Sequence, residues 1–328
     1  MRGFVYRYPF AVYDRTYCVW EYDLPARNAR FLENIDASYF GYLATLHLGQ
    51  LRDESRQHAA VALRAGYHHG LETLFSLLGA LTQAPECVPA WLPKCSNTSL
   101  RSLVAAIQAG RPVLTQCGLQ VVSLAALSQV VHQYVWQEED PPGETARRFA
   151  RLWERFAEDL LDQLHVAEYN SLKHGFRVAS GGFSLSVGRE HEYGVAPPLA
   201  EMRSLGGSRY GTSFFAPEPV STSGRRDDRS FRVRRHSLNW SAEAMAQRLL
   251  LIEFSVGNVV GALRCLTGSP PSTVRFSRPE DATAFDRPWN YPIGITSSNM
   301  DTTIEPTDVS ETGERELRAE LESRSRAV

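Results

Sequence analysis

The chain has 328 residues, of which 43% are hydrophobic and 22% are charged, with a formal net charge of −2. This composition is typical of a globular protein and excludes a chain that is disordered throughout. It also excludes a global positive field that would draw the protein to nucleic acid or to an anionic membrane, so any such binding must be local.

The cysteines and the apolar segments exclude further classes of protein. The five cysteines are odd in number and include no Cys-x-x-Cys pair, so neither a zinc knuckle nor a disulfide framework is indicated. We expect no cofactor. The first nine residues interrupt their apolar side chains with arginines, unlike a secretory signal. The most apolar run, residues 249–263, is too short to span a bilayer. We therefore expect a soluble, cytoplasmic protein with no membrane partner.

The first half of the chain predicts helices. Residues 16–22 have β composition, and the apolar spacing that follows indicates helices over residues 37–51 and 52–81, or one bent helix over both. Gly66, Gly70 and Gly79 in the longer segment predict close packing or a break. The rest of this half predicts a proline-rich loop and two more helices, over residues 84–93, 96–109 and 119–136.

Two side chains in the longer segment are candidates for binding a metal ion. His68 and Glu72 share a helix face at (i, i+4), as two ligands of a zinc ion can. A zinc site needs three or four ligands, and no other residue has a recognisable spacing to this pair. We therefore expect these side chains to be structural.

A long amphipathic helix is predicted from Asp140 to Phe176. Asp140 is a good N-cap, and Gly175 is suited to the left-handed residue that ends a helix. A helical wheel continued along the whole segment places His174 near the centre of the apolar stripe and Asn170 at its edge. Both side chains are therefore expected to point inward, either as a hydrogen-bonded structural cluster or as the lining of a cleft. The stripe consists of Phe149, Leu152, Trp153, Phe156, Leu160, Leu164 and Ala167.

After Gly175 the apolar period changes from 3.6 to 2, which predicts a small antiparallel sheet. An arginine-rich segment, residues 225–235, falls within this part of the chain. Strand alternation would place Arg232 and Arg234 on one exposed face. The segment is either a solvated surface or a local phosphate-binding patch. The candidate nucleic-acid-binding residues are Arg225, Arg226, Arg232, Arg234 and Arg235.

A last long helix is predicted over residues 240–267, with Ser241 as its cap. Gly257 and Gly261 would let another helix approach closely, either the bundle itself or a second copy in a homodimer. From residue 269 onward proline, serine, threonine and charged residues dominate, which predicts an extended, mostly disordered tail.

These elements predict a mainly α protein with a β insertion, of the α+β class. An antiparallel helical bundle carries a small antiparallel sheet, and a long C-terminal helix packs back on the bundle. The expected divisions are residues 1–176, 177–236, 237–268 and 269–328.

The end of the long predicted helix, Asn170-Ser171-Leu172-Lys173-His174, resembles the signature of the HEPN (higher eukaryotes and prokaryotes nucleotide-binding) superfamily. That signature is an arginine, often followed by a polar residue, with four to six residues before a histidine. Asn170 and His174 match the polar and histidine positions, whereas Tyr169 stands where the arginine is expected. The resemblance covers residues 37–176. It implies a helical bundle, often dimeric, with metal-independent ribonuclease activity.

Two functions are therefore compared, and whether the protein is an enzyme stays open. The first is a soluble binding or interaction protein, for example in a bacterial defence or stress system, with RNA or a protein as partner. The second is a HEPN-like ribonuclease, in which His174 acts on an RNA 2′-hydroxyl or leaving oxygen and Asn170 orients the phosphate. Lys173 or an arginine of residues 225–235 would supply positive charge. A serine hydrolase is disfavoured because the chain has no Gly-x-Ser-x-Gly motif.

Overall fold

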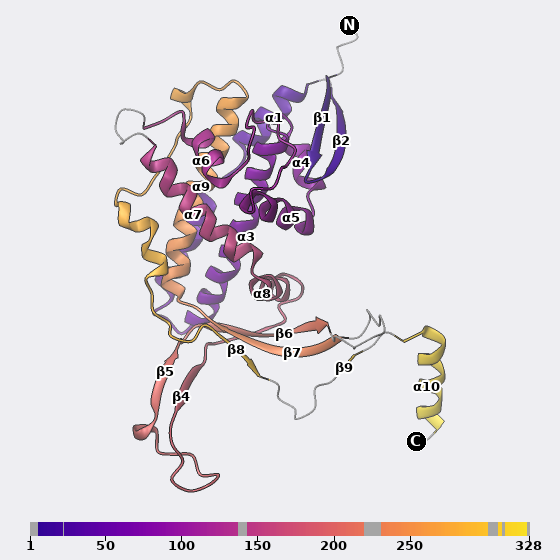
Figure 1. Ribbon diagram of the computed structural model, residues 1–328, viewed down its shortest axis with the longest axis vertical. Coiled ribbons are helices and arrows are strands. Elements are labelled where there is room, and N and C mark those ends of the chain that lie inside the picture. Colours follow the sequence, from indigo (N-terminus) through magenta and orange to yellow (C-terminus); the bar gives the residue numbers. More distant parts are fainter. Residues whose placement is uncertain are drawn as a thin grey trace. The chain divides into compact units, whose positions relative to one another are not determined.

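The computed structural model describes residues 6–21, 23–136, 143–219, 231–300, 308–309 and 312–326. It divides into two compact units, which are described separately (Figure 1). Unit 1 consists of Met1–Asn170 and Trp240–Ile293, and unit 2 of Ser171–Asn239 and Gly294–Val328. The predicted fold class is confirmed: a helical bundle, small antiparallel sheets and a long helix that returns to the bundle.

Unit 1 is a bundle of helices with one β-hairpin. The hairpin pairs β1 (Tyr6–Val12) with β2 (Arg15–Glu21). The prediction of a loop over residues 84–93 is wrong in part, because the short helix α4 begins at Val88 and ends at Lys94. Pro89 lies in its first turn, where the missing N–H is not needed, and Pro93 lies in its last turn. The helices before residue 140 are α1 (Leu24–Glu33), α2 (Ser38–Gln50), α3 (Arg56–Gln83), α4 (Val88–Lys94), α5 (Asn97–Gln108) and α6 (Leu124–His132).

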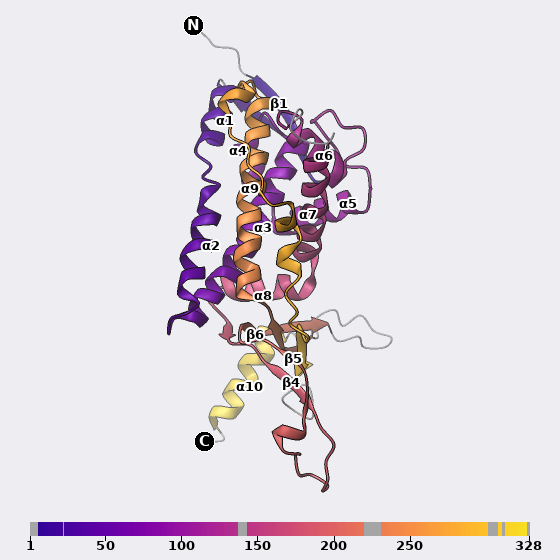
Figure 2. The same ribbon diagram turned by 90° about the vertical axis from the view of Figure 1, so that its left-hand side faces the viewer.

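The central helix α3 shows why the glycines of the predicted segment are needed. It packs on α9 (Ala242–Leu266), and the two lie side by side in Figure 2. A Cβ atom built on Gly70 would lie 2.8 Å from Ile252, and one on Gly79 would lie 2.5 Å from Trp91. The glycines therefore permit close packing, as predicted, and α2 and α3 are two separate helices.

The long helix predicted from Asp140 to Phe176 is two helices, α7 (Glu144–Leu161) and α8 (Gln163–Lys173). Residues 137–142 lie outside the described residues, and so does the predicted cap Asp140. The backbone of Asp162, at φ −62° and ψ 124°, interrupts the helical conformation. Gly175 does adopt the predicted positive φ, at +102°. The buried stripe of α7 is confirmed at Phe149, Leu152, Trp153, Phe156 and Leu160.

The return of α9 to the bundle is confirmed, with Ser241 as its cap. By length and composition α9 could cross a membrane, but most of its apolar window is buried inside the protein, as in the core helix of a globular domain. A Cβ atom on Gly261 would meet Val274 and Phe276, and one on Gly257 would lie 3.7 Å from Ala37. These two glycines therefore face segments of their own chain, which removes the reason for placing a dimer seam there.

Unit 2 contains the predicted antiparallel sheet. Its strands run in the order β3-β6-β7-β8, and β9 also pairs with β7. A separate two-stranded ribbon pairs β4 with β5. The strands are β3 (Val178–Ser180), β4 (Ser184–Val187), β5 (Arg203–Gly207), β6 (Gly211–Pro219), β7 (Phe231–Asn239), β8 (Ser297–Met300) and β9 (Asp308–Val309).

The segment from residue 269 to residue 300 differs from the extended tail that was predicted. Residues up to Ile293 belong to unit 1, where Asn258 and Ser277 exchange two hydrogen bonds of 2.8 Å between side chain and backbone. This segment includes the short 3₁₀ helices η2 (Pro271–Thr273), η3 (Ala282–Phe285) and η4 (Arg287–Trp289). Beyond β8, the helix α10 (Glu314–Arg326) is exposed along residues 314–325.

Candidate functional sites

His174 is exposed, so the prediction that it points inward is wrong. The helical wheel assumed one continuous helix, but α8 starts anew after Asp162. The buried side of α8 is formed by Glu168, Ser171 and Leu172. Lys173 is exposed beside His174, and Asn170 is half-buried. His174 and Lys173 are therefore accessible to a ligand and do not line a closed cleft.

The two candidate arginines whose side chains are described, Arg234 and Arg235, lie on opposite sides of the sheet. Arg225 and Arg226 lie outside the described residues, and only the backbone of Arg232 is described, in β7. Arg234 is half-buried and forms an ion pair of 3.0 Å with Glu218, on the same side of the sheet as the buried His236. Arg235 is exposed on the opposite side. Arg234 is thus neutralised by Glu218, and Arg235 is the candidate left available among the described side chains.

The sheet register places Arg235 in a row that the sequence analysis did not identify. Arg235 lies opposite Phe215 on β6, and the phenyl ring of Phe215 is 62% exposed. The register of β3 on β6 ends at Val178, which lies opposite Phe214. Continued by one residue, this register would bring Arg177 to the level of Phe215, on the side of the ring away from Arg235. Arg177 and Arg235 are exposed and form no side-chain hydrogen bond or ion pair with any described residue. We call these three residues the arginine–phenylalanine row.

Unit 1 contains a buried ionic cluster between α3 and α8. Arg64 donates to one carboxylate oxygen of Glu168 through both Nε (2.9 Å) and Nη2 (2.6 Å), and His68 Nε2 lies 3.2 Å from the same atom. Each of these side chains is at most 4% exposed. Burial alone would raise the pKa of Glu168, but the Arg64 guanidinium and the hydrogen bonds from His68 and Arg64 together hold that pKa well below its usual range. Burial and Arg64 together lower the pKa of His68 to about 4, so His68 is neutral at pH 7.

A second charged group continues this cluster toward the surface. Arg248 on α9 donates to Asp159 at 2.8 Å, and Tyr67 donates to the same carboxylate. Arg248 also stacks on Trp289, with its guanidinium carbon 4.6 Å from the ring centre, and Arg155 lies 4.9 Å from that centre. These side chains bind one another and connect α3, α7 and α9 to η4. We interpret the cluster as structural, because its charges are compensated inside the protein.

The spacing of the superfamily signature also occurs on α3, where Arg64 precedes His69 with four residues between them. The two side chains have different surroundings, since Arg64 is buried against Glu168 whereas His69 is exposed, with its ring edge against Phe40. Arg64 is therefore not available to a phosphate group.

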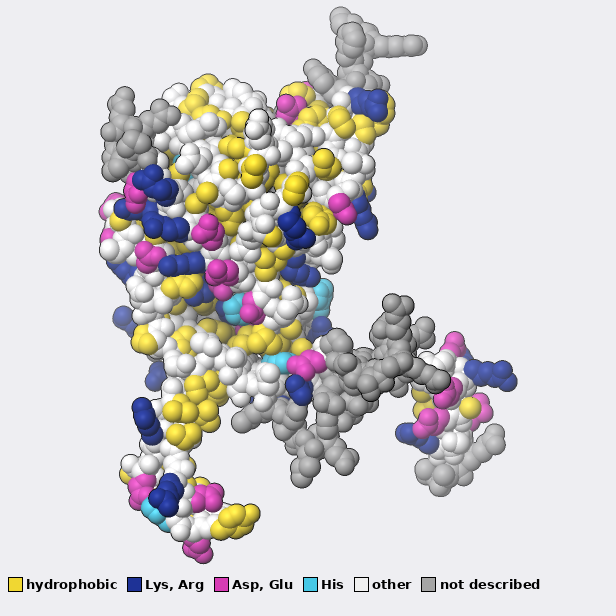
Figure 3. All heavy atoms as spheres, viewed as in Figure 1, with side chains coloured by type: hydrophobic (Ala, Val, Ile, Leu, Met, Phe, Trp, Pro, Cys, Tyr) yellow, Lys and Arg dark blue, Asp and Glu magenta, His cyan; other side chains and the backbone are white. Residues whose placement is uncertain are grey.

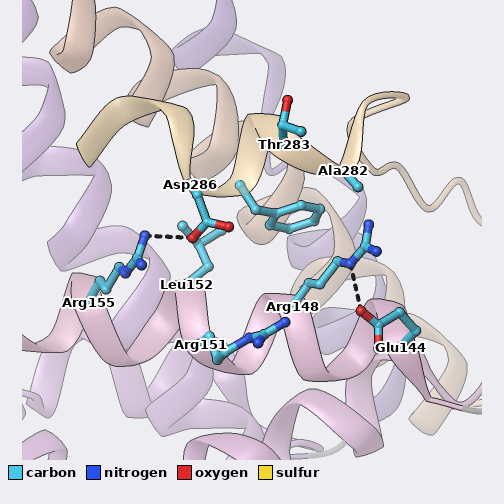
Figure 4. A pocket seen from close by; sticks show the side chains of 9 residues that line it. Glu144, Arg148, Arg151, Leu152, Arg155, Ala282, Thr283 and Asp286 are labelled. Carbon is cyan, nitrogen blue, oxygen red and sulfur yellow. Dashed lines mark hydrogen bonds and ion pairs between the residues drawn. The ribbon is translucent and has the colours of Figure 1, made fainter. Parts of the chain in front are cut away.

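A surface cavity of about 270 Å³ lies between α7 and the segment from η3 to η4 (Figure 4). Arg148 is bound to Glu144 at 2.9 Å, and Arg155 to Asp286 at 2.9 Å. Arg151, between them, forms no hydrogen bond or ion pair with any described residue. Basic and acidic side chains alternate over this face of unit 1 (Figure 3), so the cavity offers one local positive charge without a wider basic surface.

The structure does not support metal binding by His68 and Glu72. His68 Nε2 is directed at Glu168, and its ring stacks on Tyr169. In the described parts of the chain, no group of three or more His, Cys, Asp or Glu side chains could hold a metal ion.

No family model, no curated protein and no solved structure matches this chain.

Proposed function

We propose that the protein binds single-stranded nucleic acid on the side of the unit 2 sheet that carries the exposed Phe215 and Arg235. This proposal is based on the arginine–phenylalanine row, in which an exposed aromatic ring lies between two exposed arginines on adjacent segments. Neither arginine side chain is paired with a described residue. An aromatic side chain on a sheet can stack on an unpaired base, and flanking arginines can bind the phosphates. Binding at this face is compatible with the net charge of −2 of the whole chain, because the positive charge of the two arginines is local.

Neighbouring side chains support the same face. Val233 is 40% exposed and alternates with the half-buried Arg234, so it lies on the side of Arg235. Glu218 faces the other side, where it binds Arg234 and lies 3.3 Å from His236. The carboxylate nearest in sequence to the row is thus directed away from it, and phosphates approaching Arg177 and Arg235 would not meet it.

The test is fluorescence anisotropy with a labelled oligouridine and the matching oligothymidine. We expect binding that weakens with salt, and Phe215→Ala should cost roughly 1–3 kcal/mol of binding free energy, the range for one base–aromatic stack. Arg235→Gln and Arg177→Gln should each reduce the slope of log affinity against log salt by about 0.7.

Matched controls lie in the same unit. Tyr193 is fully exposed and Arg189 is exposed, both outside the row, so Tyr193→Ala and Arg189→Gln should bind as the wild type does. Absence of binding by the wild type at low salt would refute the proposal, as would equal losses in the controls.

A second candidate function, RNA cleavage at His174, is favoured by one observation. His174 and Lys173 are both exposed and lie within four residues of Arg177, the end of the row. A histidine there could take a proton from a 2′-hydroxyl while Lys173 faces the phosphate. Because His174 is exposed, His174→Ala should change stability by no more than about 0.5 kcal/mol. The activity would be established if the wild type cleaves RNA, if His174→Ala abolishes the cleavage, and if an oligonucleotide without 2′-hydroxyls is not cleaved. Binding without cleavage would support only the first function.

A further inference from the structure

The helix α2 (Ser38–Gln50) is unusual for a helix at the edge of a bundle. Its 13 residues include no Asp, Glu, Lys or Arg. Phe40, Gly41 and Ala44 are buried on its inner side, where α2 packs on α3 and α9. Figure 2 shows α2 at the border of unit 1, with its other side uncovered. An outer face of such a helix is expected to be charged, and this one is not.

The outer face of α2 is apolar and aromatic. Tyr39 is 45% exposed, Tyr42 61% and Leu46 40%, and their spacing of three and four residues puts them on one stripe. Gly49 continues the stripe, and nothing lies within 4 Å of the position that its Cβ atom would occupy. Tyrosine enrichment together with the lack of charge is the composition of the centre of a protein interface.

We propose that this face binds the same face of a second copy of the chain. The two α2 helices would be antiparallel about a twofold axis that crosses the outer face at the level of residue 44. A twofold interface requires a face that is complementary to itself. In this arrangement a residue a given number of positions before residue 44 lies opposite the partner's residue the same number of positions after residue 44. Tyr39 then meets the partner's Gly49, and Tyr42 meets the partner's Leu46. The largest side chain is thus placed against the smallest.

Charge selects the antiparallel direction. Asp36 and Arg52 are both exposed and lie eight positions before and after Ala44, so antiparallel pairing brings each Asp36 toward the partner's Arg52. Glu33 lies at the same end as Asp36, whereas Asp53, Glu54 and Arg56 follow Arg52. The first end carries two negative charges and the second end carries no net charge. Parallel pairing would put Asp36 against Asp36 and would leave two glycines facing a gap.

The test is the molar mass of the full chain by sedimentation equilibrium. We expect a dimer for the wild type. Gly49→Leu is the most informative variant, because leucine favours a helix more than glycine does and the site is open within one chain. It should keep or raise the melting temperature while it raises the dimer dissociation constant about tenfold or more.

Further variants test the arrangement. Tyr42→Lys should also give monomers, whereas Val121→Lys, at a site that is 69% exposed in another part of unit 1, should stay dimeric. Asp36→Arg and Arg52→Asp should each weaken the dimer, and combining them should restore it. A wild type that stays monomeric at every concentration reached would overturn the proposal. A dimer that Gly49→Leu and Tyr42→Lys leave unchanged would also overturn it, because another face would then form the contact.

Discussion

The side chain of Asp162 accepts a hydrogen bond of 2.9 Å from the backbone N–H of His165. Its backbone carbonyl accepts a second bond from the N–H of Val166, also at 2.9 Å. Asp162 therefore acts as the N-cap of α8 immediately after α7 has ended. This restart directs Glu168 inward to Arg64 and leaves His174 exposed.

Asp162→Ala should lower the free energy of unfolding by about 1 kcal/mol, because it removes the acceptor for an N–H group in the first turn of α8. Asp162→Asn should retain most of the stability, since an amide oxygen can accept the same bond. Urea denaturation of both variants beside the wild type measures this difference. An alanine variant as stable as the wild type would show that α8 does not depend on this cap.

Glu168→Gln should lower the free energy of unfolding by roughly 3–5 kcal/mol, because Arg64 would remain buried without a counter-charge. The double variant Arg64→Met with Glu168→Met should lose less stability than the sum of the losses of Arg64→Met and Glu168→Met made singly, since both charges then leave the interior together. A double-mutant cycle by chemical denaturation measures the coupling. Additive losses would mean that the two side chains act independently.

Stability should fall as the pH is lowered from about 6.5 to about 4. Burial lowers the pKa of both His68 and His132 to about 4, so in this range the unfolded chain binds protons that the folded protein excludes. Below the usual pKa of a glutamate, protonation of Glu168 adds a further loss, because Arg64 holds its folded-state pKa low. Urea titrations at several pH values should show the decline, and His132→Asn should make it shallower. A flat profile over this range would contradict the two lowered pKa values.

Two truncations should have different effects. Removing residues 312–328 deletes the exposed helix α10 and should shift the melting temperature by no more than a few degrees. Removing residues 297–328 also deletes β8, which pairs with β7 and carries Asn299, whose side chain lies 2.9 Å from Nδ1 of the buried His236. The longer truncation should therefore unfold at a clearly lower temperature. Equal melting temperatures for the two would show that β8 contributes little to the sheet.

Local sequence signals determined the class of the fold. The apolar stripe of α7, the cap Ser241 and the left-handed Gly175 each depend on residues within a few positions of one another. Such signals specify where a helix begins and ends and when helical periodicity gives way to strands. They were therefore readable without knowledge of the packing.

Tertiary structure decided the positions of the functional candidates. Arg64 and Glu168 are separated by 104 residues, and their pairing results from the way in which α3 and α8 pack. The row formed by Arg177, Phe215 and Arg235 exists only because the strand register places three distant segments side by side. No local pattern encodes such a register. The sequence alone therefore predicted the α+β bundle, while the exposure of His174, the neutralisation of Arg234 and the availability of Arg235 depended on long-range packing.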